Sequence, residues 1–224
     1  MATRSLTPQL APTLAAIGRG GRAFWSVVVA VWLVGAGAGL YLLARHAATP
    51  GADGAVPGTW PAGTALAPPH GRALLLVFAH PRCPCTRATL SELARLMPRV
   101  GTRVEARVVF YHPTGTDPSW GDTGLRAQAV AIPGVTVVPD ADGAEARRFG
   151  AETSGAAVLY DATGARVFHG GLTAARGHEG ASAGTEAIAS WAQGHPRGRS
   201  ATPVFGCSIW DPTRLLQGRD GLMR

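Results

Sequence analysis

Residues 78–93 read FAHPRCPCTRATLSEL, and this segment joins a strand to a helix through two closely spaced cysteines. The apolar run ALLLVFAH at 73–80 stops at Pro81, which is typical of a buried strand. Over residues 86–97, apolar side chains recur every three or four positions, as on one face of an amphipathic helix. Pro84 suits the first turn of that helix, because proline lacks an N–H that would have no partner there. The sequence therefore places the cysteine pair at the start of the helix.

Cys83 is the first of the two cysteines and the candidate nucleophile. The first turn of a helix carries N–H groups without backbone partners, and together with the helix dipole they favour a thiolate. Positive potential from His80, Arg82 and Arg87 would add to this effect. We therefore expect Cys83 to attack a substrate sulfur and Cys85 to resolve the resulting disulfide.

Three interpretations of the Cys83–Cys85 pair compete. In the first, the pair exchanges disulfides, and the small ring that it can form would be strained and easily reduced. In the second, the two sulfurs and His80 bind a soft metal such as Cu(I) or zinc. In the third, both cysteines are inert, small core residues. A peroxide-reducing site is disfavoured, because Leu76 and His80 stand where such sites carry proline and threonine. The position of the pair between strand and helix favours the redox interpretation.

The third cysteine lies in a Gly- and Pro-rich tail that contains the apolar segment TPVFGCSIW. If Val204 and Phe205 anchor this tail, its cysteine can return to the pair and serve as an alternative resolving thiol. A Gly-rich segment upstream carries Arg176 and His178, which could face the cysteines and hold a thiolate or a metal. The candidate catalytic residues are therefore Cys83, Cys85 and Cys207.

The remaining segments alternate between strands and helices. Two apolar runs on either side of residues 162–164 predict a β-hairpin. In chain order the expected elements are strand 73–80, helix 86–97, strand 103–112, short helix 125–131, strand 135–138, helical turn 144–149, strands 156–161 and 165–171, and helix 185–193. This order predicts an α/β fold with a mixed central sheet.

An uncharged apolar run lies near the N-terminus, over residues 24–44. At about 1.5 Å per residue it is long enough to cross a hydrocarbon core about 30 Å thick. A cleaved signal peptide is the main alternative, but its apolar region is shorter, so we expect an uncleaved transmembrane helix. Arg4, Arg19 and Arg22 precede the run, and the positive-inside rule then places the N-terminus in the cytoplasm and the rest of the chain outside it.

These boundaries divide the chain into five parts. Residues 45–71 are rich in Ala, Gly and Pro, which is typical of a flexible linker. The expected parts are a cytoplasmic segment 1–23, the transmembrane helix 24–44, the linker 45–71, an α/β domain 72–195 and a tail 196–224 that carries Cys207. A domain of about 120 residues is large enough to bury one hydrophobic core.

The composition excludes several classes of protein. Hydrophobic residues make up 46% and charged residues 16% of the 224 residues, which excludes a wholly disordered, highly charged chain. The net charge is +7, but every basic residue is arginine and these are dispersed, so we expect no nucleic-acid partner. Three cysteines are too few for a disulfide-stapled scaffold. Under the redox interpretation we expect no cofactor and no resident metal.

Together these motifs resemble the thioredoxin superfamily, and its membrane-anchored thiol–disulfide branch in particular. Such proteins carry the first active-site cysteine five residues after a strand phenylalanine, as Cys83 follows Phe78, and Thr86 stands where they have the second cysteine. More specifically, the chain resembles bacterial RedB-like proteins over roughly residues 72–207. The shared motifs are HPRCPCT (80–86), TSG (153–155), GGLTAARGHEG (170–180) and TPVFGC (202–207).

This resemblance implies a three-layer thioredoxin-like fold after one N-terminal transmembrane helix, and a redox role. Gly155 stands where the superfamily has a cis-proline, so Ser154 and Gly155, with His80 and Arg82, are implied to contact the substrate. The implied activity is thiol–disulfide exchange with protein thiols or disulfides, by an oxidoreductase of the bacterial inner membrane whose domain lies outside the cytoplasm. A copper-binding metallochaperone-like module and a non-catalytic assembly factor are the alternatives.

Overall fold

A computed structural model of the chain describes residues 19–195 and 199–210. The chain divides into two compact units, residues 1–45 and residues 46–224. Most of the expected cytoplasmic segment and the last residues of the expected tail lie outside the described residues.

The described part of the first unit lies in the long apolar helix α1, Arg19–Ala48, whose last three residues fall in the second unit. An 18-residue window within its segment Gly21–Ala48 has a mean hydropathy of 2.2, and α1 is the one helix in the described part of the chain that is long and apolar enough to cross a membrane. Large apolar side chains such as Val34 and Leu43 are exposed along it. The helix exceeds the predicted span of residues 24–44 by about one turn at each end.

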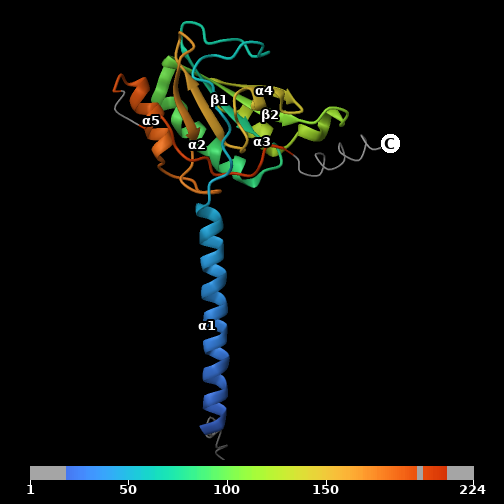
Figure 1. Cartoon of the computed structure of the whole chain (residues 1–224), viewed down its shortest axis with the longest axis vertical. Helices are drawn as coiled ribbons and strands as arrows, with labels where there is room; N and C mark the ends of the chain where they lie inside the picture. Colours follow the sequence, from blue (N-terminus) through green and yellow to red (C-terminus); the bar gives the residue numbers. More distant parts are fainter. Residues whose placement is uncertain (1–18, 196–198, 211–224) are drawn as a thin grey trace, which may run out of the picture. The chain divides into compact units, whose positions relative to one another are not determined.

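The second unit contains a five-stranded sheet in the order β3-β2-β1-β4-β5 (Figure 1). Strands β1, β2 and β3 are parallel, whereas β4 runs antiparallel to β1 and β5 antiparallel to β4. The predicted hairpin is confirmed as the β4–β5 pair. The strand bounds are Ala73–Ala79 for β1, Val104–His112 for β2, Val135–Ala141 for β3, Ala156–Tyr160 for β4 and Arg166–Gly171 for β5.

One face of the sheet is covered by helices α2 (Pro84–Val100), α3 (Gly124–Val130) and α5 (Ala183–Ala192). The odd-numbered residues of β1, such as Leu75 and Val77, point into this core, as the two-residue period of a strand requires. Short 3₁₀-helices at Gly101–Arg103 (η1) and Pro118–Gly121 (η2) complete the connections.

The opposite face carries the five-residue helix α4, Ala144–Arg148, and Trp120 of η2, and within the described residues irregular chain covers the rest of it. Part of the segment expected as a flexible linker, residues 45–71, lies against this face, with Leu66 buried and Val56 packed there, so that expectation is wrong for this part. Trp60 makes edge-to-face contacts with Phe149 at 5.1 Å and with Tyr160 at 5.3 Å. The physical reason is that large side chains on this face, in a short sheet with one small helix, need further apolar cover.

The described part of the tail also belongs to the folded unit. Val204 and Ile209 are buried in the same core as Leu76 and Phe78. Backbone bonds fix its course, with the Gly51 N–H donating to the Val204 carbonyl at 2.8 Å. Both faces of the mixed sheet are thus covered, and the expected thioredoxin-like α/β fold is confirmed.

Candidate thiol site

Cys83 lies where the chain leaves β1 and enters α2. It is the N-cap residue of α2, with extended dihedral angles of −87° and 121°, and Pro84 begins the helix. The Cys83 N–H donates to the His80 carbonyl at 3.2 Å, and the Thr86 N–H donates to the Cys83 carbonyl at 3.1 Å. This tight turn places the thiol beside the free N–H groups of the first helical turn, as the sequence predicts. The side chain is only 3% exposed.

Three sulfurs meet at this point. The sulfur atoms of Cys83, Cys85 and Cys207 all lie within 4.8 Å of one another. All three residues are free cysteines, and they differ in exposure, because Cys83 is buried, Cys85 is half-buried and Cys207 is exposed. The tail thus carries its cysteine to the pair on α2. The site therefore contains three neighbouring thiols rather than the two of the Cys83–Cys85 pair.

The electrostatics of the three thiols single out Cys83. Burial by itself would raise the pKa of Cys83, but hydrogen bonds from the Cys207 thiol and from the backbone N–H groups of Cys207, Cys85 and Thr86 outweigh it and lower this pKa. Burial and the neighbouring Cys83 sulfur raise the pKa of Cys85. Burial and the hydrogen bond to Cys83 raise the pKa of Cys207 to about 12. Of the three thiols, Cys83 is therefore the one most readily deprotonated.

A hydrogen-bond network behind the cysteines fixes the turn that carries them. The Ser154 hydroxyl accepts from the His80 N–H at 2.9 Å and lies 2.9 Å from the Thr86 hydroxyl. The Thr86 hydroxyl in turn donates to the His80 carbonyl at 3.1 Å. Ser154 and Thr86 are fully buried. The network therefore ties the end of β1, the start of α2 and the chain before β4 to one another.

Ser154 and Gly155, implied above to contact the substrate, lie beneath the tail. The Ser154 N–H donates to the Cys207 carbonyl at 2.8 Å, and the Gly155 N–H donates to the Phe78 carbonyl at 2.8 Å. Gly155 has a φ of +99°, and a Cβ there would lie 2.9 Å from the Thr89 hydroxyl, so glycine is required. The backbone edge at Ser154 is thus already paired with the chain's own tail.

His80 and Arg82, the other two residues implied to contact the substrate, pack against aromatic rings. The His80 ring stacks on Tyr111 at 5.5 Å and meets the edge of Trp120 at 5.7 Å. The Arg82 guanidinium lies 4.4 Å from the centroid of the Trp120 ring. These contacts hold the loop between β1 and α2 against β2 and η2. Neither the segment that carries Tyr111 nor the one that carries Trp120 has a sequence pattern that predicts contact with His80 or Arg82.

Arg176 is the basic residue that acts on the cysteines, as the sequence raised as a possibility. Its positive charge lowers the pKa of Cys85, in opposition to burial and to Cys83. Its guanidinium donates to the Gly206 carbonyl and, at 3.2 Å, to the Thr49 carbonyl. A cavity of about 260 Å³ opens here, bordered by Cys207, Arg176 and Glu152. Sequence reasoning missed Glu152, which is separated from these residues along the chain.

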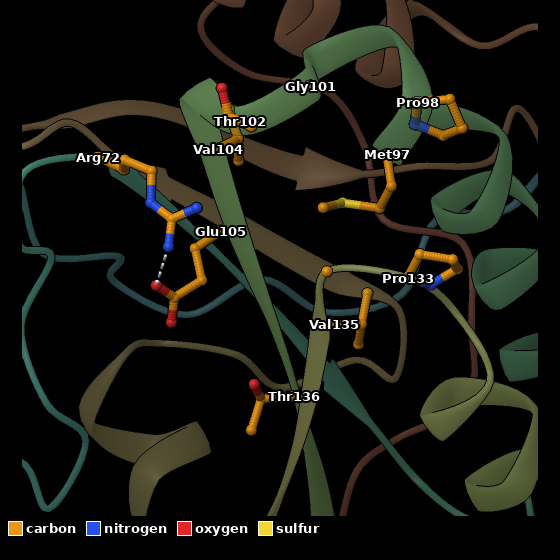
Figure 2. Close-up of a pocket in the computed structure, with 11 residues that line it drawn as sticks. Arg72, Met97, Pro98, Gly101, Thr102, Val104, Glu105, Pro133, Val135 and Thr136 are labelled. Carbon is orange, nitrogen blue, oxygen red and sulfur yellow. Dashed lines mark ion pairs between the residues drawn. The ribbon is translucent and has the colours of Figure 1, made fainter.

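A larger cavity, of about 490 Å³, lies at the opposite end of the sheet (Figure 2). It is formed where the parallel strands begin, and Figure 2 shows Met97, Pro133 and Val135 on one side of it. On the other side, Arg72 and Glu105 form an ion pair at 3.5 Å. The residues that border it include no cysteine and no histidine. This cavity therefore lacks a nucleophile of the kind found at the thiol site.

Comparison with known proteins supports the fold. No family model matches the chain, and no curated protein matches it at a significant level. Among solved structures, a hypothetical protein from Sinorhizobium meliloti 1021 is similar, with a TM-score of 0.55 and 21% identity over 71% of this chain and 98% of that one. An uncharacterized conserved protein from Geobacillus kaustophilus has a TM-score of 0.52 and 20% identity, over 74% and 94% of the two chains.

A structure with a named activity is also similar, at a lower level. It is a secreted Mycobacterium tuberculosis disulfide oxidoreductase homologous to E. coli DsbE, with a TM-score of 0.39 and 17% identity over 56% of this chain and 83% of that one. The chain has a thioredoxin-like fold. At these identities the likeness concerns the fold alone, so the chemistry has to be argued from the three thiols.

Proposed function

We propose that this protein carries out thiol–disulfide exchange with protein thiols or disulfides. The observation that supports this most directly is the convergence of three cysteine sulfurs within 4.8 Å at the N-terminus of α2. Hydrogen bonds lower the pKa of Cys83 while the pKa values of Cys85 and Cys207 are raised. A thiolate next to two thiols is the combination that disulfide exchange needs, because the thiolate attacks and a neighbouring thiol resolves.

The exchange step follows from this arrangement. The Cys83 thiolate attacks one sulfur of a disulfide, forms a mixed disulfide and expels the other sulfur as a thiolate. A second cysteine of the site then attacks Cys83, forms an internal disulfide and releases the bound sulfur, which takes up a proton. Cys85 is the resolving cysteine in this proposal, and Cys207 is the alternative. His80, Ser154 and Thr86 act by positioning the turn that carries Cys83.

We further propose that α1 anchors the domain in the bacterial inner membrane, with residues 46–224 outside the cytoplasm. The support is the length and hydropathy of Gly21–Ala48 and the arginines that precede it in the sequence. Disulfides also form and persist in oxidising compartments outside the cytoplasm. Within the thioredoxin-like fold, the motifs around the cysteines favour a protein of the RedB-like kind.

A decisive test compares three variants of the full chain in detergent. Cys83→Ser is expected to abolish disulfide exchange with a cysteine-containing peptide, whereas Cys85→Ser should leave the first attack intact and slow the release of the mixed disulfide. Ser91→Ala serves as the control, because Ser91 is a half-buried residue of α2 whose hydroxyl bonds Glu179 and Gln128 and not the cysteines. Unchanged exchange in folded Cys83→Ser protein would exclude this function and favour a non-catalytic assembly factor.

The three sulfurs also favour a second candidate function, the binding of copper(I). Soft thiolate ligands select Cu(I), and sulfurs this close need little movement to share one ion. The structure changes the predicted ligand set, because Cys207 takes the place that His80 had in the sequence-based hypothesis. Competition between the reduced protein and a coloured Cu(I) chelator measures this affinity. Tight Cu(I) binding with no exchange activity would favour copper binding over thiol–disulfide exchange as the function.

A further inference from the structure

The reactive sulfur and the accessible sulfur belong to different residues. Cys83 is the thiol most readily deprotonated but is only 3% exposed, whereas Cys207 is exposed. Disulfide exchange requires one sulfur to reach another, so both access and the choice of the attacked sulfur control its rate. A protein partner that approaches the closed site therefore meets Cys207 before it meets Cys83.

The tail that covers Cys83 is held firmly. The Cys207 carbonyl accepts from Ser154, and the Ile209 N–H donates to the Glu152 carbonyl at 2.9 Å, so the tail pairs with the chain before β4 on both sides of Ser208. Between Phe205 and Cys207, Gly206 packs so closely on the Ser154 carbonyl that no Cβ could be accommodated there. Access to Cys83 by opening the tail would therefore break several backbone hydrogen bonds.

Access to Cys207, in contrast, needs no opening. The cavity of about 260 Å³ borders Cys207 directly and is also lined by Thr153, Arg176 and Ser208. Its volume suits a side chain rather than a folded segment, and the Arg176 guanidinium provides positive charge for an incoming thiolate. The closed structure thus offers a route to one sulfur of the cluster and not to the buried one.

We propose that outside protein thiols exchange with the site at Cys207, by attacking the exposed sulfur of a Cys83–Cys207 disulfide. This inference rests on the proposed function and deepens it, because it makes Cys207 the sulfur that forms the mixed disulfide with the partner, Cys83 the buried sulfur of the internal disulfide, and protein thiols the substrate class. Cys85 is separated from Cys83 only by Pro84, so a disulfide between them closes a small and strained ring. Cys207 comes from a different segment and carries no such restriction.

Exchange at Cys207 transfers two electrons from the partner's thiols to the Cys83–Cys207 disulfide. The thiolate of the partner attacks the Cys207 sulfur, the Cys83–Cys207 bond breaks, and its electron pair stays on Cys83 as the buried thiolate. A second thiolate of the partner then attacks the partner's own sulfur in the mixed disulfide, and Cys207 leaves and takes up a proton. The partner loses two electrons and two protons and gains a disulfide. A small-molecule or protein disulfide restores the Cys83–Cys207 bond by the reverse exchange.

The electrostatics support this direction of attack. A sulfur whose thiolate is stabilised is the better leaving group. At Cys83 the backbone N–H groups of Cys207, Cys85 and Thr86 oppose the effect of burial on the pKa, and these donors remain when the Cys207 sulfur is in a mixed disulfide. Attack at Cys207 therefore expels a thiolate that the site stabilises. Stabilisation of the reduced form favours oxidation of the partner's thiols.

The test maps disulfides in the full chain in detergent. The protein is first oxidised with glutathione disulfide and digested without reduction, and the expected product is a peptide linking Cys83 to Cys207. The oxidised Cys85→Ser variant is then mixed with a peptide that contains one cysteine and quenched with acid. The mixed disulfide is expected on Cys207. A mixed disulfide on Cys83, or a Cys83–Cys85 link with Cys207 as a free thiol, would overturn the inference.

Two variants separate this inference from the proposed function. Cys207→Ser is expected to abolish exchange with the peptide while Cys83 stays protected from iodoacetamide. Gly206→Ala is expected to displace the tail, lower the yield of the Cys83–Cys207 link and speed alkylation of Cys83, whereas Gly124→Ala, with open space around it, should change neither. If Cys83→Ser is inactive but Cys207→Ser exchanges normally, only this inference fails; if both exchange normally, the proposed function fails as well.

Discussion

The two ends of the central sheet differ in what their cavities contain. Where the parallel strands begin, a cavity of about 490 Å³ is lined by the Arg72–Glu105 ion pair and by apolar side chains (Figure 2). Where β1 ends, a cavity of about 260 Å³ borders Cys207 and the thiol cluster. In open α/β sheets, chemistry concentrates at the carboxyl ends of the strands, because helix N-termini gather there. The comparison teaches that strand polarity, and not cavity size, locates this site.

The largest expected effect tests which end of the sheet carries the chemistry. Replacement of Thr102, which lines the large cavity, by alanine should leave thiol exchange unchanged, whereas Cys83→Ser should reduce it to the background rate. The reason is that only the second change removes the thiolate. The rate of exchange with a cysteine-containing peptide provides the measurement. An equal loss of activity in folded Thr102→Ala protein would show that the wrong end of the sheet has been chosen.

A second prediction concerns the packing of the sheet face that carries the tail. Phe149 is fully buried between Trp60, Phe78 and Tyr160 on the face that carries the tail. Phe149→Ala should lower the free energy of unfolding by about 3–5 kcal/mol, because it removes a large side chain and leaves a cavity. Denaturation by urea measures this loss. A loss below about 1 kcal/mol would mean that this face, and the tail on it, is less well packed than described.

A smaller effect is expected at the support of the thiol site. Ser154→Ala removes the acceptor of the His80 N–H and a hydrogen-bond partner of the buried Thr86 hydroxyl, which should cost about 1–3 kcal/mol of stability. Thr136→Ala, an exposed position beside the large cavity, should cost less than about 1 kcal/mol. Urea denaturation of both variants gives the comparison. If the two losses are equal, the Ser154 network does not hold the turn before Cys83.

The sequence was sufficient for the fold because the elements carry periodic signals. The apolar run of β1, the helical spacing over α2 and the two runs of the hairpin each follow from local patterns, and the structure confirms them. The uncharged apolar run of residues 24–44, which lies within α1, is also visible in the sequence. The position of Cys83 as an N-cap residue follows from a strand, a turn and a proline in succession.

The sequence could not reveal how the irregular segments pack. Residues 45–71 and the tail have no period, and they are held by backbone hydrogen bonds and single anchors such as Trp60 and Val204. The same limit applies to Ser154, which was expected beside an open groove but lies under the tail. Because any residue can supply a backbone N–H, such pairings leave little trace in the sequence.

The most direct test of the account is the titration of the Cys83 thiol in the reduced protein. Thiolate absorbance in the ultraviolet is followed against pH for the wild type and for Cys83→Ser. Because hydrogen bonds lower the pKa of Cys83, the first thiolate of the wild type should form below pH 9 and at a lower pH than the first thiolate of Cys83→Ser. A first thiolate that forms at the same pH in both proteins would contradict the claim that Cys83 is the stabilised thiolate.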